Sequence, residues 1–366
     1  MKFSCYKSDL NEALQLVIKA VDPKPSVPIL SCIYIKLADG FAEFHGNNLS
    51  TGIIAKIPVA IEIPGEVVVS GRRFVDFVRN MPDDTITFNE DGNTLQIISG
   101  GANVTLLTMP IDDFPKVKLP DSTATFEIDS ATLNKLIRET VFAAEQKNLS
   151  RPLFTGVVFK IKKDSLAVAA TNTHRISFDV AQNLNFDNEA EFVVPANALK
   201  NLQGKISDTK LPVKIHYCQK FVAFDVDNFL MTARLIEGEF PPFDRLIYPD
   251  KGVTQVTVDV REFRNALELV ALMAKEDQYN KVKLVIANRQ IGISANSDSV
   301  GEAVKFVDAI VTGFDLTTYY NINYLLDVLR ILDTKDIHID FQGEYAPALF
   351  SSTENNFRYV ATPVRG

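Results

Sequence analysis

A glycine-bounded segment is the part of the sequence that most nearly matches a nucleotide-binding loop. Gly65 and Gly71 are separated by five residues, and Arg72 and Arg73 follow. A phosphate-binding loop has four residues between its glycines and a lysine after the second, so that backbone amides and the lysine surround the phosphates. Both requirements fail here. The segment therefore predicts a strand, a turn and the start of a helix.

Acidic and histidine side chains offer two further sites for chemistry. Asp225 and Asp227 are two apart, so on a strand both carboxylates would share one face and could chelate a cation. No third ligand is in view, which favours a solvated strand face. His174 could be a general base, but no nucleophile accompanies it, which favours a turn histidine held by the backbone. The sequence predicts no catalytic residue, no metal site and no cofactor.

The cysteines and the hydropathy indicate where the protein works. Cys5, Cys32 and Cys218 are odd in number and form no CxxC pair, which suits a reducing compartment. The first residues do not resemble a signal peptide, and no stretch approaches the roughly 20 apolar residues of a membrane span. We expect a cytoplasmic protein without a membrane partner.

A pattern repeated three times indicates how the chain is organised. The segments beginning at Phe3, Phe126 and Val256 each start as a short alternating strand and continue as an amphipathic helix. A second short helix follows in each repeat, with alternating segments before and after it. The sequence therefore predicts an α+β fold of three tandem domains, each with two helices on an antiparallel sheet. Proline-marked joints place the domains at residues 1–120, 121–249 and 250–366.

Charge is distributed unevenly between helices and the rest of the chain. The net charge of −8 argues against nucleic-acid binding unless Lys and Arg are clustered. The helical segments hold 16 Lys and Arg against 11 Asp and Glu, whereas the remainder holds 22 against 35. These segments are predicted at 9–24, 71–80, 131–151, 195–205, 261–276 and 321–335. Basic helices are compatible with DNA contact and equally with an ordinary solvated helix face.

Short motifs occur in order along the whole chain. They are Pro25–Leu30, Met109–Pro115, Ala170–Arg175, Glu237–Phe243, Asn323–Leu329 and Tyr359–Arg365. Each resembles the corresponding segment of the bacterial DNA polymerase III beta subunit, the sliding-clamp family. Three positions differ: Asn172 stands where the family usually has Asp, Phe243 where it has Tyr, and Gly366 where it commonly has a larger apolar residue.

The resemblance implies a non-enzymatic protein that closes around duplex DNA. It implies a head-to-tail homodimeric ring of six domains, lined by lysines and arginines that contact phosphates without reading sequence. The implied DNA contacts are Lys24, Arg72, Arg73, Lys147, Arg151, Lys200 and Lys205. Ring closure is expected to join the first domain near Val104 and Leu106 to the third domain near Leu272 and Met273.

The resemblance also implies a hydrophobic groove between the second and third domains. Short linear peptides of the replicative polymerase, the clamp loader and repair proteins would bind there. The implied groove residues are Phe154, Thr171, Thr173, His174, Arg175, Ile176, Pro241, Arg245, Leu246, Tyr324, Val360, Thr362, Pro363, Val364 and Arg365. Two alternatives remain open at this point. One is an enzyme with its site near Asn172, His174 and Asp244, and the other is a β-rich scaffold with no DNA role.

Overall fold

The computed structural model divides the chain into two compact units. It describes residues 1–82, 84–119, 121, 123–146, 150–207, 209–274, 280–297, 301–352 and 354–365. Unit 1 comprises Met1–Asn134 with Asn197–Leu235, and unit 2 comprises Lys135–Ala196 with Ile236–Gly366. The middle third of the chain contributes to both units because its strands belong to two different sheets.

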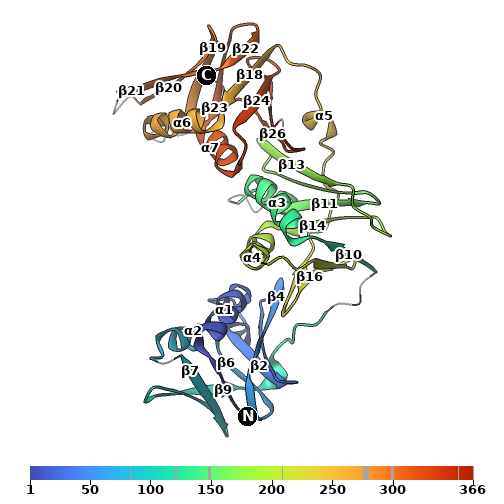
Figure 1. The fold of residues 1–366 in the computed structure, drawn as a ribbon, viewed down its shortest axis with the longest axis vertical. Helices are drawn as coiled ribbons and strands as arrows, with labels where there is room; N and C mark the ends of the chain where they lie inside the picture. The colour runs from blue at the N-terminus through green and yellow to red at the C-terminus, as the bar shows by residue number, and fades with distance from the viewer. Residues whose placement is uncertain are drawn as a thin grey trace. The chain divides into compact units, whose positions relative to one another are not determined.

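Unit 1 is built on one 13-stranded sheet with antiparallel pairing (Figure 1). In sheet order its strands are β10 (Ala124–Ile128), β15 (Val213–Tyr217), β16 (Phe221–Val226), β17 (Phe229–Arg234), β4 (Thr51–Pro58), β3 (Phe41–Asn47), β2 (Cys32–Ala38), β6 (Gly65–Ser70), β9 (Ala102–Met109), β8 (Thr94–Ser99), β7 (Thr85–Asp91), β1 (Lys2–Tyr6) and β5 (Ala60–Ile63). Strand β17 pairs with β4, with Met231 opposite Ile53. This pairing extends the strands of the first repeat into those of the second.

Unit 2 holds two sheets. The nine-stranded sheet runs β14 (Ala190–Pro195), β11 (Gly156–Lys162), β12 (Ser165–Thr171), β13 (Arg175–Gln182), β26 (Arg358–Ala361), β25 (Ala348–Ser351), β24 (Asp336–Phe341), β18 (Thr254–Asp259) and β22 (Ile310–Gly313). The four-stranded sheet runs β21 (Gly301–Asp308), β20 (Gln290–Ser297), β19 (Lys281–Ala287) and β23 (Leu316–Asn321). Strand β13 pairs with β26, with Ile176 opposite Val360, and so joins the second repeat to the third.

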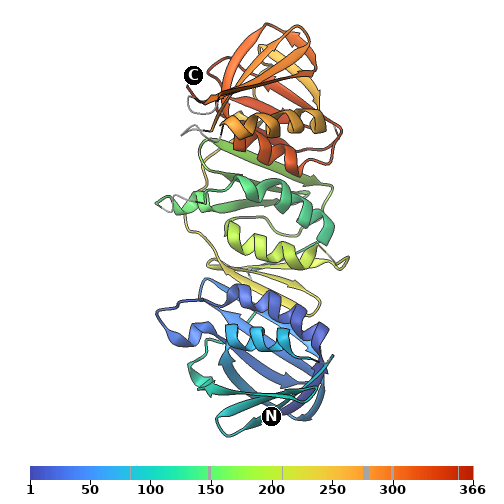
Figure 2. The same ribbon diagram turned by 90° about the vertical axis from the view of Figure 1, so that its left-hand side faces the viewer.

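The helices confirm the predicted threefold repeat. Each repeat has one helix directly after its first strand and another directly after a later strand. The first set is α1 (Lys7–Val17), α3 (Ser130–Thr140) and α6 (Val260–Ala274), and the second is α2 (Gly71–Asn80), α4 (Ala196–Ile206) and α7 (Ile322–Ile331). Helix α1 packs against α2, and α6 packs against α7 (Figure 2). The predicted α+β fold of three tandem domains is therefore confirmed.

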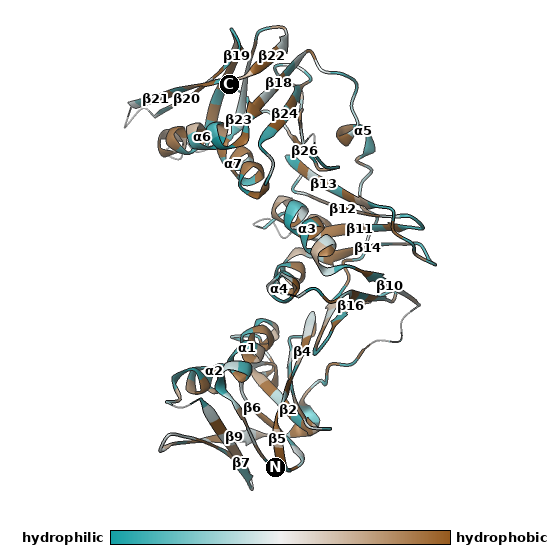
Figure 3. Cartoon of the chain, viewed as in Figure 1, coloured by the Kyte–Doolittle hydropathy of each residue, from teal (hydrophilic) through white to brown (hydrophobic). Residues whose placement is uncertain are grey.

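The apolar periodicity of the helices matches the buried positions. In α6, Phe263, Leu267 and Val270 are fully buried, as spacings of three and four residues predict for one helix face. In α2, Phe74, Val75 and Val78 are buried, while Arg72, Arg73, Asp76 and Arg79 are exposed. The helices accordingly show hydrophobic and hydrophilic residues side by side in Figure 3. None of the helices in the described part of the chain has the length and hydropathy that a membrane span requires.

Three helices are shorter than predicted: α1, α3 and α7, of which α7 ends at Ile331 instead of residue 335. Helix α3 ends at Thr140 instead of continuing to residue 151, because the Thr140 backbone leaves the α-helical region at φ −124° and the chain continues as a 3₁₀ turn at Val141–Ala143. Helix α1 ends at Val17 and a 3₁₀ turn continues to Ala20.

The Gly65–Arg73 and Asp225–Asp227 interpretations have different outcomes. Gly65–Ser70 forms strand β6, and α2 begins at Gly71, as predicted. The prediction of one strand face for Asp225 and Asp227 was wrong, since Asp227 lies in the β16–β17 turn with φ 52°. Within the described residues, no cluster of three metal-binding side chains occurs.

Candidate functional site

An apolar pocket lies in unit 2. Its volume is about 200 Å³, and its lining comes from strands β12, β13 and β26, the short helix α5 (Asp244–Ile247) and the segments next to them. The lining residues are Phe154, Thr171, Thr173, His174, Arg175, Ile176, Phe240, Pro241, Pro242, Phe243, Leu246, Pro347, Val360 and Thr362. Such a concave site with few polar groups is typical of a ligand or peptide pocket.

A buried hydrophobic cluster forms the floor of this pocket. Ile176, Phe240, Phe243 and Val360 belong to it and are at most 4% exposed. The rings of Phe240 and Phe243 are 5.9 Å apart with their planes nearly perpendicular, which is a favourable aromatic arrangement. Leu246 lies at the rim and remains 47% exposed. The pocket therefore combines a rigid floor with an uncovered apolar side chain.

A tight turn between β12 and β13 forms one wall. The Thr171 hydroxyl donates to the carbonyl oxygen of Arg175 at 2.6 Å and accepts from the Thr173 amide at 3.0 Å. The Asn172 Oδ1 atom accepts from the amides of His174 and Arg175, both at 3.1 Å. His174 is thus held in a turn by neighbouring backbone, as the sequence predicted.

Arg175 is a buried cation in this wall. Its guanidinium donates to Asp327 Oδ2 at 2.6 Å and to the Phe142 carbonyl oxygen at 2.7 Å. It also stacks on the rings of Tyr324 and Phe142. Burial alone would lower the pKa of Arg175, but Tyr359 and Asp327 favour the charged form and the net shift is upward. Arg175 is therefore a fixed charge that supports the wall.

The segment after β26 forms the opposite wall. The Thr362 amide and hydroxyl each donate to the His174 carbonyl oxygen at 2.9 Å. The Val364 amide donates to the Tyr319 carbonyl oxygen at 2.8 Å. These bonds hold the segment beside the β12–β13 turn, although it no longer belongs to a strand.

Ten of the fifteen residues expected in the groove line this pocket. The other five do not line it. Arg245 is exposed on α5, and Tyr324, which belongs to α7, stacks against the Arg175 guanidinium. Pro363, Val364 and Arg365 come directly after the lining residue Thr362. The expectation omitted Phe240, Pro242, Phe243 and Pro347. Three of these belong to the Glu237–Phe243 motif, which could have identified them. Nothing in the sequence marks Pro347.

The expected phosphate contacts are mostly exposed cations. Arg72 and Arg73 lie on the solvent side of α2, and Lys200 lies on that of α4. Lys205 is half-buried, 4.0 Å from Glu12. Lys24 and Arg151 are exposed in non-helical segments, contrary to the predicted helix bounds, and Lys147 and Gly366 lie outside the described residues.

Net positive charge is concentrated on the helices. Six helices of ten or more residues in the described part of the chain carry 11 Lys and Arg against 7 Asp and Glu, while the full sequence carries 38 against 46. The remainder of the chain therefore supplies the whole acidic excess.

The residues expected at the ring contact differ in exposure. Leu272 on α6 is 67% exposed, and Met273 packs partly against the core. On β9, Val104 is half-buried and Leu106 is only 8% exposed, because both lie on the core side of the strand and Leu106 pairs with buried Leu95. Leu106 is therefore a core residue, and its neighbour Leu107, 72% exposed, is the side chain free to contact another molecule.

Among the described strands that have an unpaired edge are β9 and β21. Residues Ala102–Leu107 of β9 pair only with β8, and β6 meets β9 only at Thr108 and Met109. Strand β21 pairs only with β20 among the described strands. Its Val304 and Phe306 side chains are 48% and 60% exposed. Open edges of this kind are templates for pairing with another chain.

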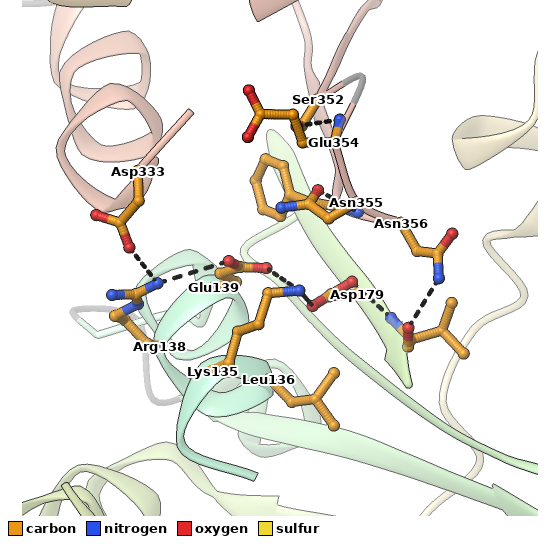
Figure 4. Close-up of polar contacts among 12 residues, drawn as sticks. Lys135, Leu136, Arg138, Glu139, Asp179, Asp333, Ser352, Glu354, Asn355 and Asn356 are labelled. Atoms are coloured by element: carbon orange, nitrogen blue, oxygen red, sulfur yellow. Dashed lines mark hydrogen bonds and ion pairs between the residues drawn. The ribbon is translucent and has the colours of Figure 1, made fainter. Parts of the chain in front are cut away.

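A charged cluster with two buried carboxyl groups, Glu139 and Asp179, is shown in Figure 4, and none of its residues lines the pocket. Lys135 Nζ lies 3.2 Å from Asp179 Oδ2 and 3.7 Å from Glu139 Oε2, and Arg138 reaches Asp333 at 2.7 Å. Burial and then the neighbouring Asp179 raise the pKa of Glu139 from 4.5 to about 8. The two carboxyl groups are at most 3% exposed, so they anchor α3 to β13 and offer no access to a substrate.

Replacing Glu139 by Gln should remove the loss of folding stability that ionisation of this buried carboxyl group causes at higher pH. Because the folded-state pKa is raised, the native carboxylate lowers the free energy of unfolding progressively as pH rises from about 4.5 to about 8. Glu139→Gln should be more stable than the parent by about 2–4 kcal/mol at pH 8 and similar to it at pH 4.5. Thermal denaturation across this range tests the prediction. The control is Glu237→Gln, because Glu237 is exposed. If the stabilities of Glu139→Gln and of the parent changed with pH in the same way, the prediction would be contradicted.

Comparison with known proteins identifies the family. Residues 1–118, 127–242 and 245–365 match the N-terminal, central and C-terminal domains of the DNA polymerase III beta subunit. The beta sliding clamp of Bacillus subtilis is 31% identical over 378 residues and covers 100% of both chains. That of Streptococcus pneumoniae is 28% identical over 99% of each.

Solved structures show the same fold. The DNA polymerase sliding clamp from Bacillus subtilis superposes with a TM-score of 0.94 at 30% identity, covering 100% of this chain and 99% of that one. A sliding clamp from Pseudomonas aeruginosa bound to griselimycin has a TM-score of 0.93 at 25% identity, with both chains fully covered. All three repeats are thus accounted for, and the chain belongs to the DNA polymerase III beta subunit family, the sliding clamps of DNA replication.

Proposed function

We propose that two copies of the chain close head to tail as a ring of six domains around duplex DNA. The observation that carries the proposal is the threefold repeat of a strand–helix domain. Our proposal places these domains at residues 1–120, 121–249 and 250–366. Three domains per copy make half of such a ring. The open edges of β9 and β21 would pair across each joint, with Leu107 and Leu272 buried beside them.

The proposed contact with DNA is electrostatic and independent of sequence. Basic helices line the hole, and exposed Arg72, Arg73 and Lys200, with Lys24, Lys147, Arg151 and Lys205, meet phosphates. Each contact can be weak, because a closed ring stays on DNA by its topology and does not need to bind tightly. The acidic excess outside the helices discourages DNA from binding elsewhere on the protein.

The pocket in unit 2 is proposed as the docking groove for linear peptides. Partners would be the replicative polymerase, the clamp loader and repair proteins, which insert one or two apolar side chains over Ile176, Phe243 and Val360. His174 and Arg245 would donate to polar groups of the peptide. The Pseudomonas aeruginosa clamp bound to griselimycin is a precedent for ligand binding in this family.

The enzyme and scaffold alternatives do not agree with family membership. Sliding clamps are non-enzymatic, and the Asn172 side chain is engaged by backbone amides of its own turn. A protein acting on the bacterial chromosome is expected in the cytoplasm.

Retention on circular DNA tests the ring proposal. Loaded with its ATP-driven clamp loader onto nicked circles, the protein should stay bound through gel filtration and leave within minutes after the circle is linearised. Arg72→Ala with Arg73→Ala should weaken direct binding to duplex DNA about tenfold and lower its salt dependence, because two phosphate contacts are lost. Equal retention on circles and on linear DNA with free ends would contradict the topological proposal.

A further inference from the structure

One residue of the pocket-forming turn does not itself line the pocket. Thr171, Thr173, His174 and Arg175 contribute to the lining, whereas Asn172 faces away from it and toward α7. Its Oδ1 atom accepts from two backbone amides, and its Nδ2 atom donates to the Tyr324 hydroxyl at 3.2 Å. The backbone amides of His174 and Arg175 are donors and can bond only to the side-chain oxygen of Asn172, so Oδ1 must point toward them and Nδ2 toward Tyr324.

The turn that Asn172 holds is a strained one. Thr173 has φ 77°, a left-handed conformation that β-branched residues rarely adopt. Such a conformation persists only where neighbouring bonds maintain it. The His174 carbonyl oxygen of the same turn accepts both bonds from Thr362, so the shape of the turn also determines where the opposite wall lies.

We infer that Asn172 is a positioning residue of the groove, which shapes the pocket-lining turn and ties it to α7 through Tyr324. The inference rests on the proposed peptide groove. Tyr324 supports the turn at a second point, since its ring stacks under the Arg175 guanidinium with Cζ 4.6 Å from the ring centre. Without the Asn172 amide, three hydrogen bonds are lost and Thr173 can relax toward a common backbone conformation.

Two substitutions separate positioning from a general effect on folding. Asn172→Ala removes all three hydrogen bonds. Asn172→Asp keeps the two bonds from the backbone amides, and the Tyr324 hydroxyl can rotate and donate to the carboxylate. Asn48→Ala is a matched control, because Asn48 Oδ1 accepts in the same way from the Ser50 and Thr51 amides at 3.1 and 2.8 Å in a turn of unit 1.

The measurement is the Kd of a fluorescent peptide from the C-terminal tail of the replicative polymerase, with the Tm of each full-length variant recorded separately. Asn172→Ala should weaken binding about tenfold or more, and Asn172→Asp should restore it to within about threefold of the parent. Asn48→Ala should lower the Tm but leave the Kd unchanged.

Several outcomes would overturn the inference. An unchanged Kd for Asn172→Ala, no recovery in Asn172→Asp, or equal weakening by Asn48→Ala would each do so while leaving the groove proposal intact. Failure of the unaltered chain to bind the peptide would overturn the groove proposal and the inference together.

Discussion

Deletion of residues 362–366 should reduce peptide binding strongly, raising the Kd about 10- to 100-fold. Thr362 lines the pocket, and its two bonds to His174, with the bond from Val364 to Tyr319, hold one wall in place. Without that wall, an anchor side chain loses contacts that are worth about 1.5–3 kcal/mol when it is fully buried. The intact chain should bind an isolated polymerase-tail peptide with micromolar affinity, because ordering the peptide offsets part of the gain.

The deletion should act on the groove alone. Fluorescence titration of the peptide gives the Kd, and retention on nicked circular DNA reports the ring. Retention should be unchanged, because the proposed ring contacts lie on β9, β21 and α6. Glu354→Ala is the control, since Glu354 is exposed near the same end of the chain and does not line the pocket. Peptide affinity that survives the deletion would show that partners dock elsewhere.

The double substitution Leu107→Asp with Leu272→Asp should convert a dimer to monomers and abolish retention on circular DNA. Both leucines are more than 65% exposed in the single chain, so the changes leave its core intact. At the proposed joint each carboxylate would be buried without a partner, at a cost of about 3 kcal/mol or more. The dimer dissociation constant should therefore rise by several orders of magnitude.

Sedimentation velocity at micromolar concentration measures this change. Leu49→Asp is the matched control, because Leu49 is an exposed leucine (58%) outside the proposed joint. Its backbone has φ 69°, a conformation that Asp adopts more readily than Leu, so this substitution should not destabilise the fold. Leu106→Asp should instead lower the Tm sharply, because Leu106 is packed in the core. A parent chain that sediments as a monomer, or a double variant that remains dimeric, would refute the proposed joint.

The sequence by itself determined the fold class and the repeat. Alternation in strands and spacings of three and four in helices are local properties of the chain, so the helices beginning near Lys7, Ser130 and Val260 were predictable before any contact was known. The end of α3 was not. It depends on the backbone of Thr140, which leaves the α-helical region at φ −124°, and on the 3₁₀ turn that follows, and apolar periodicity records neither.

The candidate pocket was predictable only in part. Its two walls come from segments nearly 190 residues apart, and the motif around His174 was noticed through its resemblance to a family. Pro347 lines the pocket but belongs to no motif in the sequence. Tyr324 belongs to a motif but does not line the pocket, because its ring stacks against the Arg175 guanidinium. Spacing along the chain cannot distinguish a lining residue from a supporting one, because both occur in the same motif.

Exposure was decided by the tertiary structure alone. Leu106 and Leu107 are adjacent and chemically identical, yet one is 8% and the other 72% exposed, since successive residues of β9 point to opposite sides and only the packed sheet defines the buried side. The same holds for Glu139, whose raised pKa depends on burial beside Asp179, a residue 40 positions away. The sequence thus determined which elements form, and the tertiary structure decided which of their side chains meet solvent, because burial depends on contacts between distant parts of the chain.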